Sequence, residues 1–545
     1  MSHKLFEQLL KNRGLTDTVL RQAFLAPKYE SLADPLLLPD MEKAIQRLKV
    51  AHAKNQKVVI YGDYDIDGLS ATTLLLDAFE KFGFDVTTFI PSRFDDGYGL
   101  SSAALEKLVE NGAELVVTVD CGSLSFEEID FAKTIGLDII VTDHHNVGDT
   151  LPKAIAVINP KRQDHNYPFR DFAGVGVAFS LVRAMQKNFE GLPDGQEKWL
   201  LDLVALGTVC DIVSLQDENR ILAFWGLKVL QQTHRPGLKA LMAVARIKPS
   251  EIDAKGLGFG LGPRLNASGR LETARHSLDL LVAQDNAEAL RLAESLDAMN
   301  QIRRKEQNTI YGAALEQAEK YKKDPVLVLH HTDWSHGIIG IVAAKILEKH
   351  HKPTFVLQEI GEEAKGSARS FGDFSVGDAI RESEEHIIKG GGHKLAAGVT
   401  LATSKINSFR TSVNDYYYSL KLQDQKGHLL PKHDLVIADL KEVDEELIQL
   451  IAQLEPFGNK NTQPVFKIEN LKVIDMRKMG DLKQHVKIRF ADSTQKTIEF
   501  IAFSAPEHFF VNVGDRASVW VTLDINEWQG RRSIEGRLLE VDTFK

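Results

Sequence analysis

Residues 58–68 read VVIYGDYDIDG, and they decide the fold of the N-terminal half of the chain. A short apolar run that ends in a loop of glycine and aspartate is typical of a buried strand. The stretch that follows, 68–83, predicts a helix closed by a glycine. The same alternation continues, with further strands predicted at 84–91, 114–122, 137–145 and 154–160. Strands alternating with helices predict an α/β domain with a parallel sheet and right-handed crossovers.

Composition and its breaks divide the rest of the chain. A helical lead-in at 1–50 precedes this α/β core, which we place at 51–245. Residues 246–322 are predicted to form a phosphate-contacting loop and a long helical connector. A second α/β domain is expected at 323–428. Short β-type runs separated by turns predict a small antiparallel β-barrel at 429–545.

The composition excludes several classes of protein. The chain has 545 residues, 43% of them hydrophobic and 26% charged, which is typical of a soluble globular protein. Its two cysteines exclude a disulfide framework, a cysteine zinc finger and a four-cysteine iron–sulfur site, and they fit a reducing compartment. Because no run of about 18 apolar residues and no signal-peptide pattern is present, we expect a cytoplasmic protein without membrane contact. The net charge of -10 argues against a nucleic-acid partner, unless carboxylates are gathered at a metal site.

Acidic residues and histidines follow three of the predicted strands. Asp63, Asp65 and Asp67 follow the first strand, Asp120 ends another, and the run Asp143, His144, His145 ends the next. The carboxyl ends of parallel strands lie on one edge of a sheet, so these groups should converge there. Any single Asp would be explained by a turn or a helix cap. The whole set would repel itself without a cation, and it therefore predicts a metal site.

The ligand types indicate which metal. A mixed carboxylate and imidazole set without thiolate suggests Mn²⁺, with Mg²⁺ next. An aspartate bridging two ions about 4 Å apart would form a clamp for in-line displacement at phosphorus. Asp211, in GTVCDIV (207–213), is the best candidate for a further acidic ligand, although alone it would be read as a helix-terminal cap.

At this point the residues resemble a known family. The four motifs of the DHH phosphoesterases are similar to GDYDIDG (62–68), VDCG (119–122), DHH (143–145) and GTVCDIV (207–213). Further along, the chain resembles the RecJ-type single-stranded-DNA exonucleases in four segments: GPRLNASGR (262–270), WSHGIIGIVAAK (334–345), KGSARS (365–370) and GGGHKLAAG (390–398). The last two of these belong to the DHH-associated domain. EPFGNKNTQPVF (455–466) looks like the segment that leads into the RecJ oligonucleotide-binding barrel.

The resemblance assigns roles to the acidic and histidine set. It implies that the metal ligands are Asp63, Asp65, Asp67, Asp120, His144 and Asp211. Asp120 would bridge the ions, and His145 would face the scissile phosphate, so that Asp120, His144 and His145 carry the catalysis. Asp143 would orient a histidine from behind the ligands.

Four residues depart from these roles or adjoin the residues that carry them. Relatives that act on small substrates carry a His at the position of Tyr61, so Asp63 is expected to fill that ligand slot. Lys460 stands where the resemblance leads us to expect Gly, and Lys disfavours positive φ. Cys121 and Cys210 adjoin two of the expected ligands, and we interpret both as small core hydrophobes rather than metal ligands.

Candidate polymer-binding residues lie further along the chain. Arg264, Asn266 and Arg270 stand among glycines in GPRLNASGR, where backbone and side chains can approach phosphates. Ser367 and Arg369 share one face of an extended segment and resemble the RecJ pocket for a terminal 5′ phosphate. Further candidates are Arg93 and the residues Gly391, Gly392 and His393, which are predicted to open a helix with anion-binding N–H groups. Without the resemblance, each is equally well a solvated Arg or an ordinary Gly turn.

The predicted barrel has basic character of its own. Residues 471–490 carry six bases and two acids. Phe503, Trp520 and Trp528 could stack on bases, with Arg531 and Arg532 adding charge, although aromatic residues in a small barrel are more often core.

The function predicted from these features is a Mn²⁺- or Mg²⁺-dependent exonuclease that degrades single-stranded DNA from its 5′ end. The expected setting is DNA repair and recombination, with a helicase and a single-strand-binding protein as possible partners. One alternative is a DHH phosphodiesterase for short oligonucleotides or cyclic dinucleotides. The other is a non-catalytic, DHH-like replication scaffold, which a complete ligand set disfavours.

Overall fold

The computed structural model describes residues 3–91, 99–271, 273–422, 430–480, 483–528 and 531–544, apart from the side chains of 270, 271, 527, 528 and 531. The chain forms two compact units. One unit comprises residues 1–300 together with 449–463, and the other comprises 301–448 together with 464–545. Among the described residues, none of the helices combines the length and the apolar character needed to cross a membrane.

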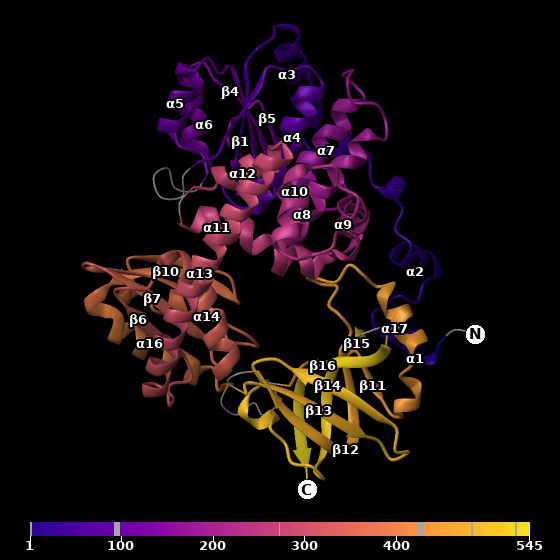
Figure 1. Ribbon diagram of the computed structural model, residues 1–545. Coiled ribbons are helices and arrows are strands. Elements are labelled where there is room, and N and C mark those ends of the chain that lie inside the picture. The colour runs from indigo at the N-terminus through magenta and orange to yellow at the C-terminus, as the bar shows by residue number, and fades with distance from the viewer. Residues whose placement is uncertain are drawn as a thin grey trace. The chain divides into compact units, whose positions relative to one another are not determined.

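The first unit is built on a five-stranded, entirely parallel sheet (Figure 1). Its strand order is β2-β1-β3-β4-β5. The strands are β1 (Val58–Gly62), β2 (Val86–Phe89), β3 (Leu115–Val119), β4 (Asp138–Thr142) and β5 (Ala156–Ile158). The predicted α/β core with a parallel sheet is thus present.

Helices cover both faces of this sheet, because neighbouring residues of each buried strand point to opposite sides. Val58 and Ile60 pack into one apolar core, and Val59 and Tyr61 pack into another. The first core is shared with α3 (Met41–Ala53), α4 (Ile66–Lys81) and α7 (Gly174–Gln186), and the second with α5 (Ser102–Glu110) and α6 (Phe126–Thr134). Strands buried on both faces read as continuous apolar runs, as VVIYG does.

The remainder of this unit is helical. It contains α1 (Lys4–Asn12), α2 (Thr18–Leu25), α8 (Leu201–Cys210), α9 (Asp217–Leu230), α10 (Pro236–Val244), a π-helical turn (Gly256–Leu261), α11 (Gly262–Leu271) and α12 (Arg275–Val282). GPRLNASGR is therefore part of a helix, and the prediction of a loop there is wrong. The 35-residue helix α13 (Asn286–Lys320) is the long connector expected from the sequence.

The second unit contains a mixed five-stranded sheet with the order β6-β7-β8-β10-β9. Its strands are β6 (Leu327–His331), β7 (Thr354–Ile360), β8 (Glu363–Arg369), β9 (Lys389–Gly392) and β10 (Ala396–Ala402). The helices are α14 (His336–His350), α15 (Val376–Glu382) and α16 (Ile406–Ser419).

The helix predicted to open at Gly391, Gly392 and His393 is wrong, because Lys389–Gly392 forms the edge strand β9. At Gly392 a Cβ atom would lie 2.5 Å from the backbone of Ala397 on β10, so this close pairing requires glycine.

The C-terminal barrel is closed and mixed rather than wholly antiparallel. Its strands are β11 (Leu435–Ile437), β12 (Phe466–Met479), β13 (His485–Ala491), β14 (Thr497–Ala502), β15 (Arg516–Trp528) and β16 (Arg531–Phe544), with α17 (Glu445–Ala452) preceding β12. Pairing of β12 with β15 closes a ring of five strands, whereas β14–β16 and β11–β12 pair in parallel. Trp520 is buried in this barrel and is therefore not available for stacking, whereas Phe503 is 62% exposed and remains a candidate. The Trp528 and Arg531 side chains lie outside the described residues.

Candidate metal centre

The loop after β1 is shaped by one aspartate and one glycine. The side chain of Asp65 caps α4 by accepting hydrogen bonds from the N–H groups of Asp67 (2.8 Å) and Gly68 (3.1 Å). A Cβ atom at Gly68 would lie 2.5 Å from the carbonyl oxygen of Asp63, so only glycine lets the helix start this close to the strand. The sequence GDYDIDG thus turns sharply, and it holds three carboxylates at the sheet edge.

Asp120 leaves β3 in the left-handed conformation, with φ of 62°, which Asp tolerates better than most residues. Its N–H still donates to Thr142 on β4, at 3.0 Å. A Cβ atom at Gly174, the first residue of α7, would lie 2.8 Å from the Asp120 Cβ. The N–H groups of Gly174 and Val175 donate to Asp67, at 2.5 and 3.0 Å. The start of α7 therefore packs under the acidic cluster and fixes Asp67.

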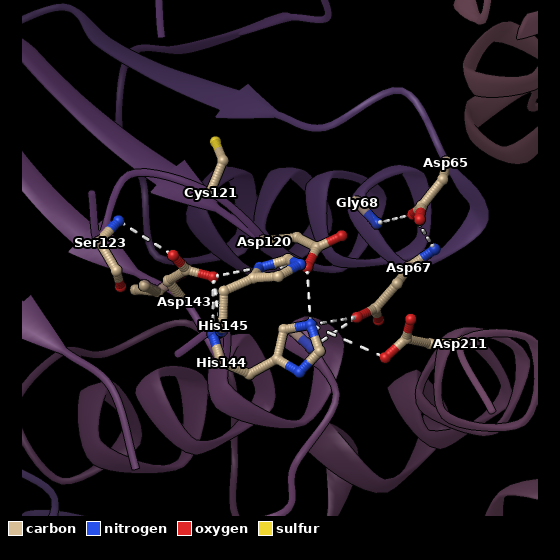
Figure 2. Close-up of polar contacts among 12 residues, drawn as sticks. Asp65, Asp67, Gly68, Asp120, Cys121, Ser123, Asp143, His144, His145 and Asp211 are labelled. Carbon is tan, nitrogen blue, oxygen red and sulfur yellow. Dashed lines mark hydrogen bonds and ion pairs between the residues drawn. The ribbon is translucent and has the colours of Figure 1, made fainter. Parts of the chain in front are cut away.

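Three overlapping sets of potential ligand atoms gather at this edge, each within 4.8 Å: Asp120 with His144 and His145, Asp67 with His144 and Asp211, and Asp63 with Asp65 and Asp120. His144 Nε2 lies 3.0 Å from Asp120 Oδ1 and 3.7 Å from Asp211 Oδ2 (Figure 2). The structure thus brings together all six residues expected as ligands, and it adds His145 to the group. Asp120 and His144 each belong to two of the three sets.

The donor set fits a divalent cation. Among the described residues, buried atoms without a hydrogen-bond partner include Asp63 Oδ1, Asp120 Oδ1 and both ring nitrogens of His144. Such groups are costly to bury, so their convergence needs a partner of another kind. Burial, aided by the charge of Asp65, raises the pKa of Asp63 and of Asp211 to about 7. Burial also lowers the pKa of His144 to about 4, which leaves the imidazole neutral, as a metal ligand must be.

Asp143 has a different environment from the other carboxylates. It accepts four hydrogen bonds, from the N–H groups of Ser123 (2.9 Å), His144 (2.7 Å) and His145 (3.1 Å) and from His145 Nδ1 (2.8 Å) (Figure 2). Burial alone would raise the pKa of Asp143, but the hydrogen bonds and the charge of His145 hold it below its usual range. Asp143 occurs in none of the three ligand sets of the described chain. It fixes the orientation of the His145 ring.

Three further sequence interpretations concern residues near the cluster. Tyr61 is fully buried and donates its hydroxyl to Gly99 at 2.9 Å, so it does not face the ligands. Cys121 packs in the apolar core that the sheet shares with α5 and α6. Cys210 Sγ lies 3.9 Å from the carbonyl oxygen of Leu257.

Sequence reasoning missed Asn159, which directly follows β5 and is fully buried. Its amide donates to Ser123 Oγ (2.8 Å) and to the His145 carbonyl oxygen (2.9 Å), which ties the loop carrying the histidines to the loop after β3. The rule that ligands follow the carboxyl ends of parallel strands could have identified it.

Of the residues proposed for phosphate contact near 262–270, Arg264 is engaged within the protein. Arg264 donates to Asp297 and to the Gly260 carbonyl oxygen, both at 2.7 Å. Asn266 is half-buried on α11. Arg93 and the side chain of Arg270 lie outside the described residues.

Ser367 and Arg369 alternate on β8, in the second unit, and they project to one face. A Cβ atom at Gly340 of α14 would lie 3.3 Å from Arg369 Nη2 and 3.4 Å from Ser367 Oγ. Both side chains therefore lie against the same point of α14, where glycine leaves them space. Gly391, Gly392 and His393 are exposed at the edge of this sheet.

Several basic residues of the barrel are neutralised within it. Lys487 pairs with Glu499 and Glu535, at 2.7 and 2.8 Å, and Arg489 also pairs with Glu499. The local excess of bases in the sequence thus overstates the positive charge that these strands offer.

Comparison with known proteins identifies the family. The pattern of the DHH family N-terminal domain matches residues 57–208, that of the DHHA1 domain matches 323–419, and that of the RecJ OB domain matches 434–540. The single-stranded-DNA-specific exonuclease RecJ of Bacillus subtilis is 35% identical over 97% of this chain, which spans 66% of that protein's length. The protein of the same name from Salmonella typhimurium is 34% identical over 91% of this chain and 89% of its own.

Solved structures agree. The crystal structure of RecJ from Thermus thermophilus in complex with Mn²⁺ has a TM-score of 0.81 and 27% identity, covering 99% of this chain and 76% of that one. The complex of the same protein with Mg²⁺ has a TM-score of 0.75 and 25% identity, covering 99% and 74%. The chain belongs to the RecJ family of exonucleases, which is built on the DHH domain. The predicted fold class and the predicted enzyme class, a metal-dependent nuclease, are confirmed.

Proposed function

We propose that this protein hydrolyses single-stranded DNA from its 5′ end, with Mn²⁺ or Mg²⁺ as cofactor. The observation that carries the proposal is the sharing of Asp120 and His144 between neighbouring sets of ligand atoms. A shared carboxylate is what two adjacent ions require. The non-catalytic alternative is disfavoured, because a scaffold has no need for five buried or half-buried carboxylates that repel one another.

The ligands of two ions are Asp63, Asp65, Asp67, Asp120, His144 and Asp211. When bound, the ions polarise a phosphate and provide a hydroxide nucleophile at neutral pH. The protein supplies the orientation. Asp143 holds His145 through Nδ1, and the His145 side chain is 46% exposed, so its ring can contact a phosphate at the edge of the cluster.

The 5′ polarity and the choice of a polymer belong to the second unit in this proposal. Arg369 would clamp oxygens of a terminal phosphate, with Ser367 beside it on β8. The closed barrel would hold the strand beyond its end, since small barrels of this kind bind single strands in a charged groove with stacked bases. A role in DNA repair and recombination, in the cytoplasm and beside a helicase and a single-strand-binding protein, completes the proposal.

The test is digestion of end-labelled DNA, single- and double-stranded, with Mn²⁺, with Mg²⁺ and with EDTA. We expect release of 5′ nucleotides from single strands only, and only with metal. Digestion from the 3′ end would contradict the polarity. A dinucleotide cleaved as efficiently as a long strand would instead support the alternative of a short-substrate phosphodiesterase.

A further inference from the structure

The segment between α17 and β12 lies in an unexpected place. The sequence suggests that EPFGNKN (455–461) leads into the barrel. Residues 449–463 nevertheless form part of the first unit, which carries the candidate metal centre and is called the catalytic unit below. Lys460 has φ of 57°, so the turn adopts the left-handed conformation that a glycine would favour, with a lysine in its place. This conformation is unfavourable for a residue with a Cβ atom, so the shape of this turn is maintained against strain.

The turn contacts the residues that directly follow the metal-ligand candidate Asp211. Asn459 donates from its side chain to the carbonyl oxygen of Ile212, at 2.7 Å. The N–H of Leu215 donates to the carbonyl oxygen of Asn459, at 2.9 Å. At Gly458 a Cβ atom would lie 2.6 Å from Leu215 Cδ1, so the approach is as close as a glycine permits. Asn459 thus bonds the 212–215 loop at both of its ends.

This loop needs outside support. Ile212 has φ of 60°, which is a strained conformation for a β-branched residue. Its side chain is 69% exposed, so burial of the isoleucine does not offset the strain. Ile212 directly follows Asp211, the C-cap residue of α8, so a relaxed Ile212 would redirect the backbone next to this ligand candidate. The hydrogen bond from Asn459 favours the strained conformation.

The turn is itself rigidly held. Arg220, on α9 and almost fully buried, donates to the carbonyl oxygens of Leu454 (2.9 Å) and Glu455 (2.8 Å). Burial lowers the pKa of Arg220 to about 10, which leaves it charged at neutral pH. Asn461, also buried, donates to the carbonyl oxygens of Leu454 and Pro456, both at 2.8 Å. The base of the turn is thus fixed on the helix that follows the Asp211 loop.

We propose that the turn Glu455–Asn461 is a positioning element of the metal centre, and that Asn459 is its positioning residue for Asp211. Asn459 contacts neither substrate nor metal. It holds Ile212 in the left-handed conformation, and so keeps Asp211 beside His144 and Asp67. The inference rests on the metal centre of the proposed function, but not on the nature of the DNA substrate.

The test compares Asn459→Ala with a matched control, Lys460→Ala. Lys460 is the next residue and lies in the same exposed turn, but its side chain reaches Asp171, at 3.3 Å, and not the Asp211 loop. We would measure Mn²⁺ binding by electron paramagnetic resonance without DNA, the melting temperature in EDTA, and kcat and KM for a single strand. Because Asn459 and Ile212 are both exposed, the variant is expected to fold.

We expect Asn459→Ala to bind Mn²⁺ about two- to tenfold more weakly, the effect of one hydrogen bond. At limiting Mn²⁺ kcat should fall, saturating Mn²⁺ should restore it, and KM for DNA should stay unchanged. Adding Ile212→Asn should recover the affinity, because Asn adopts the left-handed conformation at less cost than Ile. Lys460→Ala should match the parent.

Mn²⁺ affinity equal to the parent's in Asn459→Ala would overturn the proposal, and so would an equal loss in Lys460→Ala. A lower melting temperature in EDTA without weaker Mn²⁺ binding would also overturn it, since the role would then be structural only. If Asn459→Ala binds Mn²⁺ more weakly while the parent itself fails to digest single-stranded DNA, this inference is supported and the proposed substrate is refuted. The two failures are therefore distinguishable.

Discussion

Asp120→Asn provides the sharpest test of the metal centre, because it removes one charge at nearly constant shape. Asp120 takes part in two of the three sets of ligand atoms, and its Oδ1 lies 3.0 Å from His144 Nε2. Losing it weakens the sites of both ions, which together contribute several kcal/mol to the transition state. A loss of about 4 kcal/mol corresponds to about a thousandfold lower kcat. The structure therefore predicts nearly complete loss of cleavage, with binding of single-stranded DNA retained.

The same substitution should have the opposite effect on the stability of the metal-free protein. Burial, followed by the charge of Asp67, raises the pKa of Asp120 well above its usual value, so its charged form is unfavourable when no cation is present. Asp120→Asn removes that cost, and the melting temperature in EDTA should equal or exceed that of the parent. Saturating Mn²⁺ should raise the melting temperature of the parent much more than that of the variant.

Both effects can be measured on one preparation, by timed release from 5′-labelled single strands and by thermal unfolding with EDTA or Mn²⁺. An Asp120→Asn protein that keeps more than a few per cent of the parent's kcat with the same metal dependence would refute the bridging role. A marked drop of the melting temperature in EDTA would refute the view that this carboxylate is buried for the metal rather than for the fold.

Three other perturbations test the acidic cluster, the terminal-phosphate pocket and the barrel. The pKa values of Asp63 and Asp211 are about 7 in the folded state and exceed those of unfolded aspartates. The free energy of unfolding of the metal-free protein should therefore fall as the pH rises from 5 to 8. Urea unfolding in EDTA at several pH values checks this, and a free energy of unfolding that rises over this range would contradict it. Arg369→Ala should abolish a preference for 5′-phosphorylated over 5′-hydroxyl strands, at a cost of about 1.5–3 kcal/mol, and release rates for the two substrates measure it. Ending the chain after Gln463 should weaken binding to long strands and lower the log–log salt slope by about 0.7 for each phosphate that the protein no longer binds, whereas an unchanged slope in the folded truncation would exclude the barrel from binding.

The fold of the catalytic unit could be predicted because its information is local. VVIYG has no charged residue and is buried at every position, as expected of a strand covered on both faces, and the acidic loops follow the strands directly. The parallel topology then places Asp63, Asp120 and His144 at one edge without further assumptions. Five of the six expected ligands converge for this reason, whereas Asp211 comes from the end of the helix α8 and was assigned as a ligand by the resemblance.

The errors concern features that depend on distant partners. Glycines 390–392 resemble a helix start, but pairing with β10 makes them an edge strand. GPRLNASGR resembles a loop because of its glycines, yet packing of α11 and α12, which includes a hydrogen bond between Ser268 and Ser277, makes it helical. The segment 455–461 does lead into the barrel strand β12, as expected, but only its hydrogen bonds to the Asp211 loop and to Arg220 reveal that it also packs in the first unit.

The three residues of the DHH motif show how one local sequence produces three different chemical environments. Asp143 has its oxygens occupied by N–H donors, so it stays ionised and cannot offer them to a cation. His144, the next residue, is buried, and its Nε2 points at carboxylates, 3.0 Å from Asp120 Oδ1, so the neutral imidazole can bind a cation held among them. His145 is held by Asp143 through one ring nitrogen, and its side chain is 46% exposed, as the proposed contact with a phosphate requires. The three proposed roles, which are metal ligand, support and substrate contact, therefore differ in how far the protein itself satisfies the hydrogen-bonding groups of each side chain. Spacing in the sequence alone cannot make that distinction.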